Sequence, residues 1–212
     1  MLYYENQIGN TRVAIWHITE DYEQLLGILP DAESISSEAE TCFASEKRRL
    51  EWTSVRVLLY TMLERQVQIS YNEHGAPLLP EYEGLHISIS HTGSYVAIAL
   101  SDKNKVGIDI EQVEHLEAGK ESRVERVKSR FMADDEQADT VIGLLLHWSA
   151  KESVFKVVGK EVADFQNDMH ILPFDELCYE GNLKMNAQDG NTYIILYKVF
   201  NDFVLTLTNY EQ

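Results

Sequence analysis

The sequence is short of cysteine, of positive charge and of long apolar runs. Its two cysteines, Cys42 and Cys178, lie far apart and show no metal-ligand spacing, so we expect both thiols to be reduced. No apolar stretch approaches the length that spans a bilayer, and the N-terminus lacks the basic and apolar regions of a signal peptide. These absences argue against a membrane protein and a disulfide-rich secreted protein, and we expect a cytoplasmic protein.

Positive charge is scarce but concentrated. The chain has 18 basic and 35 acidic residues, a net charge of −17, which argues against nucleic acid as a partner because nucleic acid is bound chiefly by basic surface. Half of the basic residues fall in two short windows, where the local potential can be positive on an acidic protein. The windows contain Lys47, Arg48, Arg49 and Arg56, and Lys120, Arg123, Arg126, Lys128 and Arg130.

Several familiar catalytic and nucleotide-binding motifs are also missing. The chain has no Walker-type phosphate loop, no dinucleotide fingerprint and no Gly-x-Ser-x-Gly elbow. Ser90 and His91 are adjacent on a predicted strand, so their side chains point to opposite faces and are badly placed to exchange a proton. These observations argue against a serine hydrolase, and a structural role for His91 remains an alternative.

The residues that are present predict an α+β protein. Hydrophobic residues make up 44% of the 212, enough to fill a core. In the first half, Ser37 with Glu40 has the pattern of a capping box that opens a helical region reaching about Arg65. The other elements that we predict there are a strand over 11–18, a loop over 71–80 and a hairpin over 85–100 with its turn at 92–94.

The second half repeats this outline of strand, helices and antiparallel strands. Its longest helix is predicted over 139–158, ended by Gly159. The other elements that we predict are a strand over 106–111, a helix over 121–132, a helical turn over 173–177 and strands near 183, over 193–199 and over 203–208. The polar stretch 101–105 is a plausible linker, so we predict an N-terminal domain over 1–102 and a C-terminal domain over 103–212.

Two acidic residues alternate with isoleucine in the segment Gly107-Ile108-Asp109-Ile110-Glu111. Residues two apart on a strand share a face, so Asp109 and Glu111 would emerge on one side while the isoleucines enter the core. Carboxylates in this arrangement suit Mg²⁺, which prefers hard oxygen ligands together with substrate phosphates and water. The alternative is a solvated face of an edge strand.

A second cluster has helical spacing, in the segment that runs from Trp148 to Lys156. Its residues Trp148, Lys151, Glu152, Phe155 and Lys156 fall on adjoining positions of one face, and Glu152 stands one turn before Lys156. A face that mixes aromatic residues with Glu and Lys indicates a site, although an ordinary surface ion pair between Glu152 and Lys156 is the alternative.

Taken together, these segments resemble the 4′-phosphopantetheinyl transferase superfamily, of the two-lobed, broad-specificity type that activates synthetases. The resemblance covers roughly residues 45–175. One departure is Gly75-Ala76-Pro77, where the family usually has Gly-Lys-Pro, so an expected phosphate-binding lysine is absent. The matching motifs are Gly107-Ile108-Asp109-x-Glu111, Trp148-Ser149-x-Lys151-Glu152-x-x-x-Lys156, Ser88-Ile89-Ser90-His91-Thr92, Arg130-Phe131-Met132 followed by Glu136, and a basic helix with Lys47, Arg48, Arg49 and Arg56.

The resemblance implies an enzyme that transfers the 4′-phosphopantetheine group of coenzyme A to a serine of an apo acyl or peptidyl carrier protein and releases adenosine 3′,5′-bisphosphate. It implies two similar lobes related by a pseudo-two-fold, with the active site between them. It assigns Mg²⁺ to Asp109, Glu111 and Glu152, and catalysis to Glu152 as general base and to Lys156. Coenzyme A would contact Arg48, Arg49, Arg56, Gly75, Pro77, Ser90, His91, Lys151 and Lys156.

Two other functions stay open at this point. The first is a catalytically silent relative that binds coenzyme A or a carrier protein, to which Ala76 gives slight support and against which Asp109, Glu111, Glu152 and Lys156 speak. The second is a magnesium-dependent phosphatase, which lacks a candidate nucleophile motif. Because two lobes in one chain would complete a site, we expect a monomer.

Overall fold

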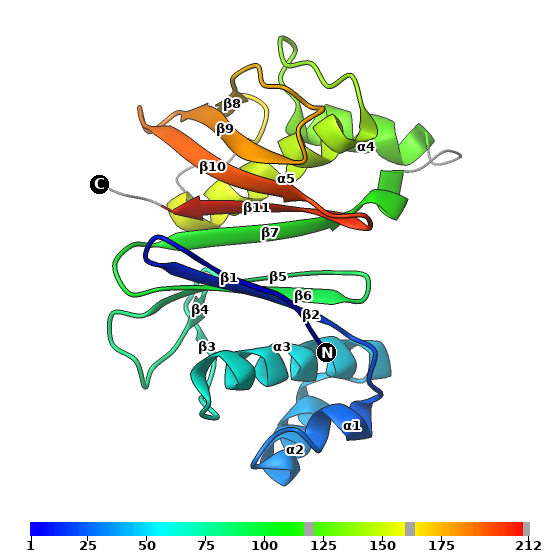
Figure 1. Ribbon diagram of the computed structural model, residues 1–212, viewed down its shortest axis with the longest axis vertical. Helices are drawn as coiled ribbons and strands as arrows, with labels where there is room; N and C mark the ends of the chain where they lie inside the picture. The colour runs from blue at the N-terminus through cyan, green and yellow to red at the C-terminus, as the bar shows by residue number, and fades with distance from the viewer. Residues whose placement is uncertain (117–120, 160–163, 210–212) are drawn as a thin grey trace. The chain divides into compact units, whose positions relative to one another are not determined.

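The computed structural model describes residues 1–116, 121–159 and 164–209 (Figure 1). Backbone contacts divide the chain into two compact units, Met1–Lys103 and Asn104–Gln212. Each unit contains an antiparallel sheet and helices, which confirms the predicted α+β class. None of the helices in these ranges is long and apolar enough to cross a membrane. Cys42 and Cys178 are both free and exposed, as expected.

The first unit has a four-stranded sheet with the order β1-β2-β6-β5, and two of its three helices, α1 and α2, pack against the third, α3. Its long helix α3 lies against β2 and β6, and Leu58, Ile98 and Ala14 in their contact are fully buried. The elements are β1 (Leu2–Ile8), β2 (Thr11–His17), α1 (Tyr22–Leu26), α2 (Ala32–Cys42), α3 (Glu46–Leu63), β3 (Ser70–Tyr71), β4 (Pro77–Leu78), β5 (His86–Thr92) and β6 (Tyr95–Ser101).

Two sequence patterns in this unit had different outcomes. The hairpin is confirmed, because β5 and β6 pair from His86 opposite Ser101 to Thr92 opposite Tyr95. The helix start at Ser37 is wrong, since Ser37 lies inside α2, whose first turn is capped by the Asp31 side chain accepting from the Ser34 amide at 3.2 Å. Aspartate is as good an N-cap as serine, so the earlier of two acceptable caps begins the helix.

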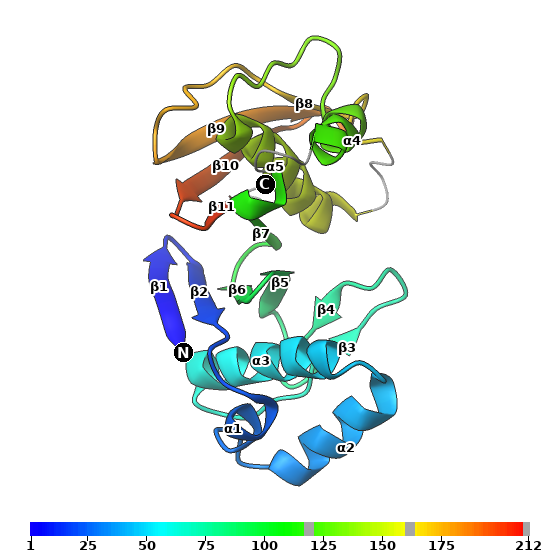
Figure 2. The same cartoon turned by 90° about the vertical axis from the view of Figure 1, so that its right-hand side faces the viewer.

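The second unit has a five-stranded antiparallel sheet with the order β7-β11-β10-β9-β8. Helix α5 lies along β7 and β11 (Figure 1), and α4 packs against α5 on the same side of the sheet (Figure 2). The elements are β7 (Val106–Gln112), the 3₁₀ turn η1 (Val113–Leu116), α4 (Glu121–Phe131), α5 (Val141–Val158), β8 (Met169–Ile171), β9 (Glu180–Ala187), β10 (Thr192–Val199) and β11 (Phe203–Asn209).

Both ends of α5 are defined by side chains and backbone. At its start the Thr140 hydroxyl accepts from the Gly143 amide at 2.8 Å, and the carboxylate of Glu176 accepts from the Thr140 amide and hydroxyl. At its end Gly159 adopts a φ of 78°, so the predicted stop is confirmed. The helical turn predicted over 173–177 is wrong, because this stretch has no regular secondary structure before a turn at 176–177, and it carries Glu176 to the start of α5.

Candidate active site

The close approach of α5 to β7 depends on a glycine. A Cβ atom on Gly107 would lie 1.8 Å from the carbonyl oxygen of Ser153, so only a residue without a side chain lets the helix pack here. Asp109 is two residues further along β7 and therefore shares this face. Its side chain is 7% exposed, so the strand presents a nearly buried carboxylate to the helix.

Lys156 reaches this carboxylate from the C-terminal half of α5. Its ammonium donates to Asp109 Oδ1 at 2.9 Å and to the carbonyl oxygen of Ile108 at 2.7 Å. The Lys156 side chain stays 26% exposed, so the ion pair is open to solvent on one side. Lys156 thus pairs with Asp109 on the strand, and the alternative of an ordinary surface ion pair with Glu152 is not what the structure shows.

Glu152 lies one turn before Lys156 and is partly buried. Burial raises the pKa of its carboxyl, and the negative charge of Asp109 raises it further, while Lys156 and Arg130 act in the opposite direction. Like charges disfavour each other's ionised form, so two carboxylates in this arrangement repel each other. A group between them that carries positive charge, a proton or a metal ion, would relieve this repulsion.

The donor chemistry of this pair fits Mg²⁺, which takes one or two protein carboxylates and fills its remaining positions with water and phosphate oxygens. Glu111 follows Asp109 on the same face of β7 and is partly exposed. Within the described residues, however, no three Asp, Glu, His or Cys side chains converge as a metal-ligand set. The charges of Asp109 and Glu152 act on each other, and a metal site completed by Glu111 stays a prediction.

Lys151 has a different environment from the one that the sequence indicated. Its side chain is completely buried, and its ammonium donates to Glu136 Oε2 at 2.6 Å and to the carbonyl oxygen of Phe165 at 2.9 Å. Burial lowers the pKa of Lys151, and the bond to Glu136 opposes that effect. An ammonium enclosed in this way is not accessible to a ligand, so the geometry gives no support to the predicted phosphate contact.

Glu136, which the sequence analysis named only as part of a matching motif, completes this buried pair. Its two carboxylate oxygens also accept from the amides of Ala133 and Ile171, at 2.7 and 2.6 Å. One signal was present: Leu144, Lys151 and Val154 follow the spacing of a helix face, and a lysine on an apolar face needs an acidic partner. The partner itself lies 15 residues away in the chain and could not be found from that spacing.

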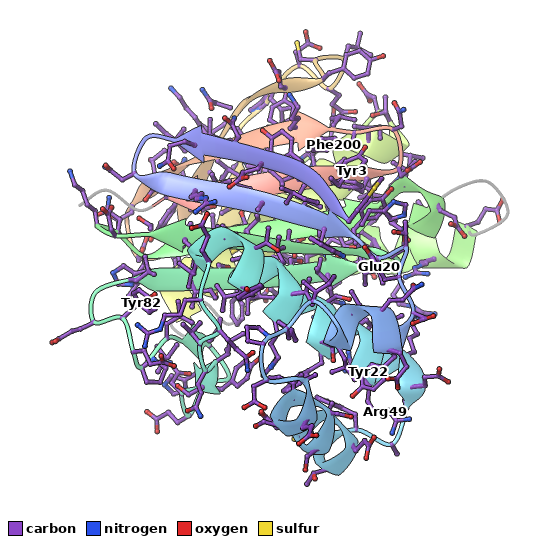
Figure 3. The ribbon with its side chains drawn as sticks, turned by 60° about the horizontal axis from the view of Figure 1, so that its bottom comes forward. Tyr3, Glu20, Tyr22, Arg49, Tyr82 and Phe200 are labelled. Carbon is purple, nitrogen blue, oxygen red and sulfur yellow. The ribbon has the colours of Figure 1, made fainter. Side chains whose placement is uncertain are left out.

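The basic residues of the first unit are mostly engaged with their own helix. Lys47 and Arg48 both pair with Glu51, at 3.8 and 3.4 Å. Arg56 is buried with its guanidinium carbon 3.0 Å from the centre of the Trp52 ring, and burial lowers its pKa to about 10. Arg49, labelled in Figure 3, lies in the first turn of α3 and is partly exposed. Of the four, Arg49 is therefore the side chain best placed to meet a ligand.

The remaining predicted contacts lie on β5 and in the turn between β3 and β4. Ser90 is 7% exposed whereas His91 is exposed, so they occupy opposite faces of β5 as the sequence indicated. Gly75 has a φ of 81°, a conformation that favours glycine. Ala76 is held by its backbone, because its amide donates to Asn72 Oδ1 and its carbonyl accepts from the Asn72 amide, both at 3.0 Å. The turn keeps a defined shape whatever side chain stands at position 76.

Comparison with known proteins gives a consistent result. The sequence model of the 4′-phosphopantetheinyl transferase superfamily matches residues 105–208, which include β7 and α5. The chain is 32% identical over 160 residues to the 4′-phosphopantetheinyl transferase Sfp of Bacillus subtilis strain 168, covering 68% of this chain and 66% of that protein. It is 29% identical over 154 residues to the 4′-phosphopantetheinyl transferase ffp of Bacillus subtilis, covering 66% of this chain and 62% of the relative. The matched part thus spans just under two thirds of these relatives.

Proposed function

Because the chain belongs to the 4′-phosphopantetheinyl transferase superfamily, we propose that it transfers the 4′-phosphopantetheine group of coenzyme A to a serine of an apo acyl or peptidyl carrier protein, with Mg²⁺ as cofactor. The observation that carries the proposal is the meeting of Asp109, Glu152 and Lys156 at the contact of β7 with α5. All three lie in the range that the family model matches. They belong to the two motifs whose charged side chains meet where α5 packs on β7.

The reaction needs a base, a stabilised leaving group and an orienting cation. The serine hydroxyl attacks the β-phosphorus of coenzyme A, the bond from that phosphorus to the oxygen bridging to the α-phosphate breaks, and adenosine 3′,5′-bisphosphate leaves with the electron pair. Mg²⁺, held by Asp109 and Glu152 with Glu111 beside them, would neutralise phosphate charge and orient the phosphate for in-line attack.

Glu152 and Lys156 perform the proton chemistry in this proposal. Glu152 accepts the proton of the attacking hydroxyl, a role suited to a carboxylate whose pKa is raised by burial and by Asp109. Lys156 stabilises or protonates the leaving oxygen, and its 26% exposed side chain leaves the ammonium accessible to a phosphate. Lys151, which is enclosed, holds the helix that carries both residues.

The first unit supplies further contacts to coenzyme A in this proposal. Arg49 offers a planar guanidinium for a phosphate group, and the exposed His91 offers a second polar contact. Gly75 and Pro77 form part of a turn that can shape a pocket for the adenine. Ser90 and Arg48 would act with them, and Arg56, which lies against the Trp52 ring and 3.8 Å from Glu38, would add a further cation.

The exposed face of α4 is our candidate for the carrier-protein surface. Arg123, Arg126 and Lys128 are exposed and form no ion pair with any other residue that the structure describes. Arg130 continues this basic face and acts on the pKa of Glu152, so α4 leads from solvent toward the site. Lys120, the first residue of the predicted basic window, lies outside the described residues.

The test is to incubate the full chain with coenzyme A, Mg²⁺ and an apo acyl carrier protein, and to weigh the carrier by mass spectrometry. A carrier heavier by one phosphopantetheine group supports the proposal, and Glu152→Gln is the matched inactive control. An unchanged carrier together with tight binding of coenzyme A would indicate a silent relative. Release of inorganic phosphate from coenzyme A without transfer would indicate a phosphatase.

A further inference from the structure

Two pairs of buried hydroxyl groups join α5 to β11. Ser149 Oγ lies 2.8 Å from Thr206 Oγ1, and Ser153 Oγ lies 2.8 Å from Thr208 Oγ1. All four residues are completely buried. The serines are one helical turn apart and the threonines are two residues apart on one face of the strand, so the two pairs form a short ladder between helix and sheet.

The donor of each pair follows from the other bonds of these hydroxyls. Thr206 donates its hydrogen to the carbonyl oxygen of Ser149, so the Ser149 hydroxyl must donate to Thr206. Ser153 donates to the carbonyl oxygen of Ala150, so Thr208 must donate to Ser153. Every hydrogen is therefore committed, and a slide of the helix along the strand would leave buried polar groups unpaired.

This ladder lies beside the candidate active site. In the pairing of β11 with β7, Thr206 is opposite Asp109 and Thr208 is opposite Gly107, the residue that the Ser153 carbonyl touches. On the helix, Lys156 is two turns after Ser149 and so lies on the same face. The helix is thus fixed at the two hydroxyl pairs and at the contact of Lys156 with Asp109.

We infer that Thr206 and Thr208, through Ser149 and Ser153, are positioning residues that set the register of α5 on β7 and with it the separation of Glu152 from Asp109. Apolar side chains at these positions would bind the helix to the sheet but would not specify one register, because apolar contact is not directional. The role in catalysis rests on the proposed function, whereas the role in register does not. The inference also gives a physical reason for the serine in the Trp148-Ser149 motif.

The test uses the full chain and removes one hydroxyl at constant shape. Thr206→Val deletes the ladder contact nearest Asp109, and Thr206→Ser restores the hydroxyl. Thr192→Val is the matched control, since the Thr192 hydroxyl bonds to Asn186 on an exposed part of the same sheet. The measurements are the affinity for Mn²⁺ by calorimetry without coenzyme A, and the thermal midpoint by circular dichroism.

We expect Thr206→Val to remain folded and to bind Mn²⁺ about tenfold more weakly, as is typical when a residue that supports a metal ligand is changed. Thr206→Ser should recover the native affinity, and Thr192→Val should keep it. A native Mn²⁺ affinity in Thr206→Val, with only the thermal midpoint lowered, would show a purely structural role and overturn the inference. If Thr206→Val does not fold, Thr208→Val is compared in the same way.

A metal-free crystal structure of Thr206→Val separates this inference from the proposed function. If the native chain neither binds Mn²⁺ nor modifies a carrier, the proposed function fails, but the register can still be read. A contact between Lys156 Nζ and Asp109 Oδ1 that lengthens beyond hydrogen-bond range supports the inference. A contact that keeps its native length of 2.9 Å in the variant overturns it.

Discussion

Lys151 and Lys156 both pair with a carboxylate, and they lie on the same helix, yet their surroundings differ. The Lys151–Glu136 pair has no exposed side-chain surface, and both partners are bonded to backbone groups as well. The Lys156–Asp109 pair is partly open and has Glu152 beside it. In the enclosed pair both charged groups are hydrogen-bonded, so either partner would leave a buried charge unpaired if it turned to a ligand. Beside the open pair, the carboxylate of Glu152 still favours the binding of a cation.

One helix can therefore be fixed and reactive at the same time. Glu136 receives bonds from the loop after α4 and from β8, so Lys151 ties α5 to segments that are distant in sequence. That anchor lies one residue before Glu152. The charged groups of the open pair can then exchange protons, metal or phosphate without the helix being displaced.

The largest effect is expected from removing the reactive carboxylate beside the open pair. Glu152→Gln should lower the transfer rate by about 10²–10⁴-fold, because the variant loses a proton acceptor. Glu111→Gln should lower it less, because Glu111 would only help to hold the metal whereas Glu152 would also accept the proton. Both are compared by rate of carrier modification at saturating Mg²⁺. Near-normal turnover in Glu152→Gln would contradict the base assignment.

Breaking the enclosed pair should cost more stability than breaking the open one. Lys151→Met leaves the Glu136 carboxylate buried without its cation, and we expect a loss of about 3–5 kcal/mol in the free energy of unfolding. Lys156→Met should cost about 1 kcal/mol or less, because its pair is partly solvated. Urea unfolding of both variants measures the difference. Equal losses would remove the distinction between the two pairs.

A third variant adds a charge in the turn where the family usually has lysine. Ala76→Lys should tighten coenzyme A binding by about 1.5–3 kcal/mol if the new ammonium reaches the 3′-phosphate. The backbone bonds of residue 76 to Asn72 do not depend on its side chain, so the turn should persist. Calorimetry with dephospho-coenzyme A is the control: an equal gain there would indicate general electrostatics.

Arg123 and Arg126 on α4 are exposed and form no ion pair with another described residue, so reversing their charge tests whether this surface binds the carrier protein. Reversing Arg123 and Arg126 to Glu should raise the KM for an acidic carrier about tenfold and flatten its dependence on salt, because exposed interface charges govern association. The KM for coenzyme A should change little. Lys184→Glu, an exposed reversal on β9, is the matched control. An unaltered carrier KM at low ionic strength would place the docking surface elsewhere.

The smallest effect is expected on the stability of the metal-free protein, which the ionised Glu152 carboxylate lowers near neutral pH. Its raised pKa means that the folded state holds the proton more tightly than the unfolded state. The resulting stabilisation is complete below the ordinary glutamate pKa of about 4.3 and is lost as the pH rises through the folded pKa. Glu152→Gln should therefore gain stability relative to the native chain near neutral pH, and added Mg²⁺ should narrow the gap. Thermal unfolding of both proteins across a range of pH measures the difference between their midpoints. A difference that does not change with pH would contradict the raised pKa of Glu152.

Sequence periodicity predicted the elements that carry the site, because each has a strong local pattern. Alternation placed β7 and its carboxylate, and the helical spacing that ends at Gly159 placed α5. The strand β1 was not predicted, since it is an edge strand whose exposed polar residues show no alternation. The three residues of β8 are too few for a periodic signal.

The charges of the site were harder to assign, because ion pairs form across long sequence separations. The sequence placed Lys151 and Lys156 together near phosphate, but only the fold shows that Glu136 takes the first and Asp109 the second. The contact of Gly107 with the backbone of Ser153 could not be predicted either. The glycine is nevertheless consistent with it, because a side chain at position 107 would clash with the helix. Partners that the chain separates by 15 to 48 residues cannot be read from local spacing.

The start of α5 has a consequence for where anions bind. A helix N-terminus attracts anions, but here the carboxylate of Glu176 already accepts from the Thr140 amide and hydroxyl, and it lies where a side chain on Gly143 would be. The chain thus places a carboxylate of its own at this end. A sulfate or phosphate ion supplied in a crystallisation or inhibitor screen would have to displace a covalently tethered competitor there, so ligand density near the first turn of α5 is not expected.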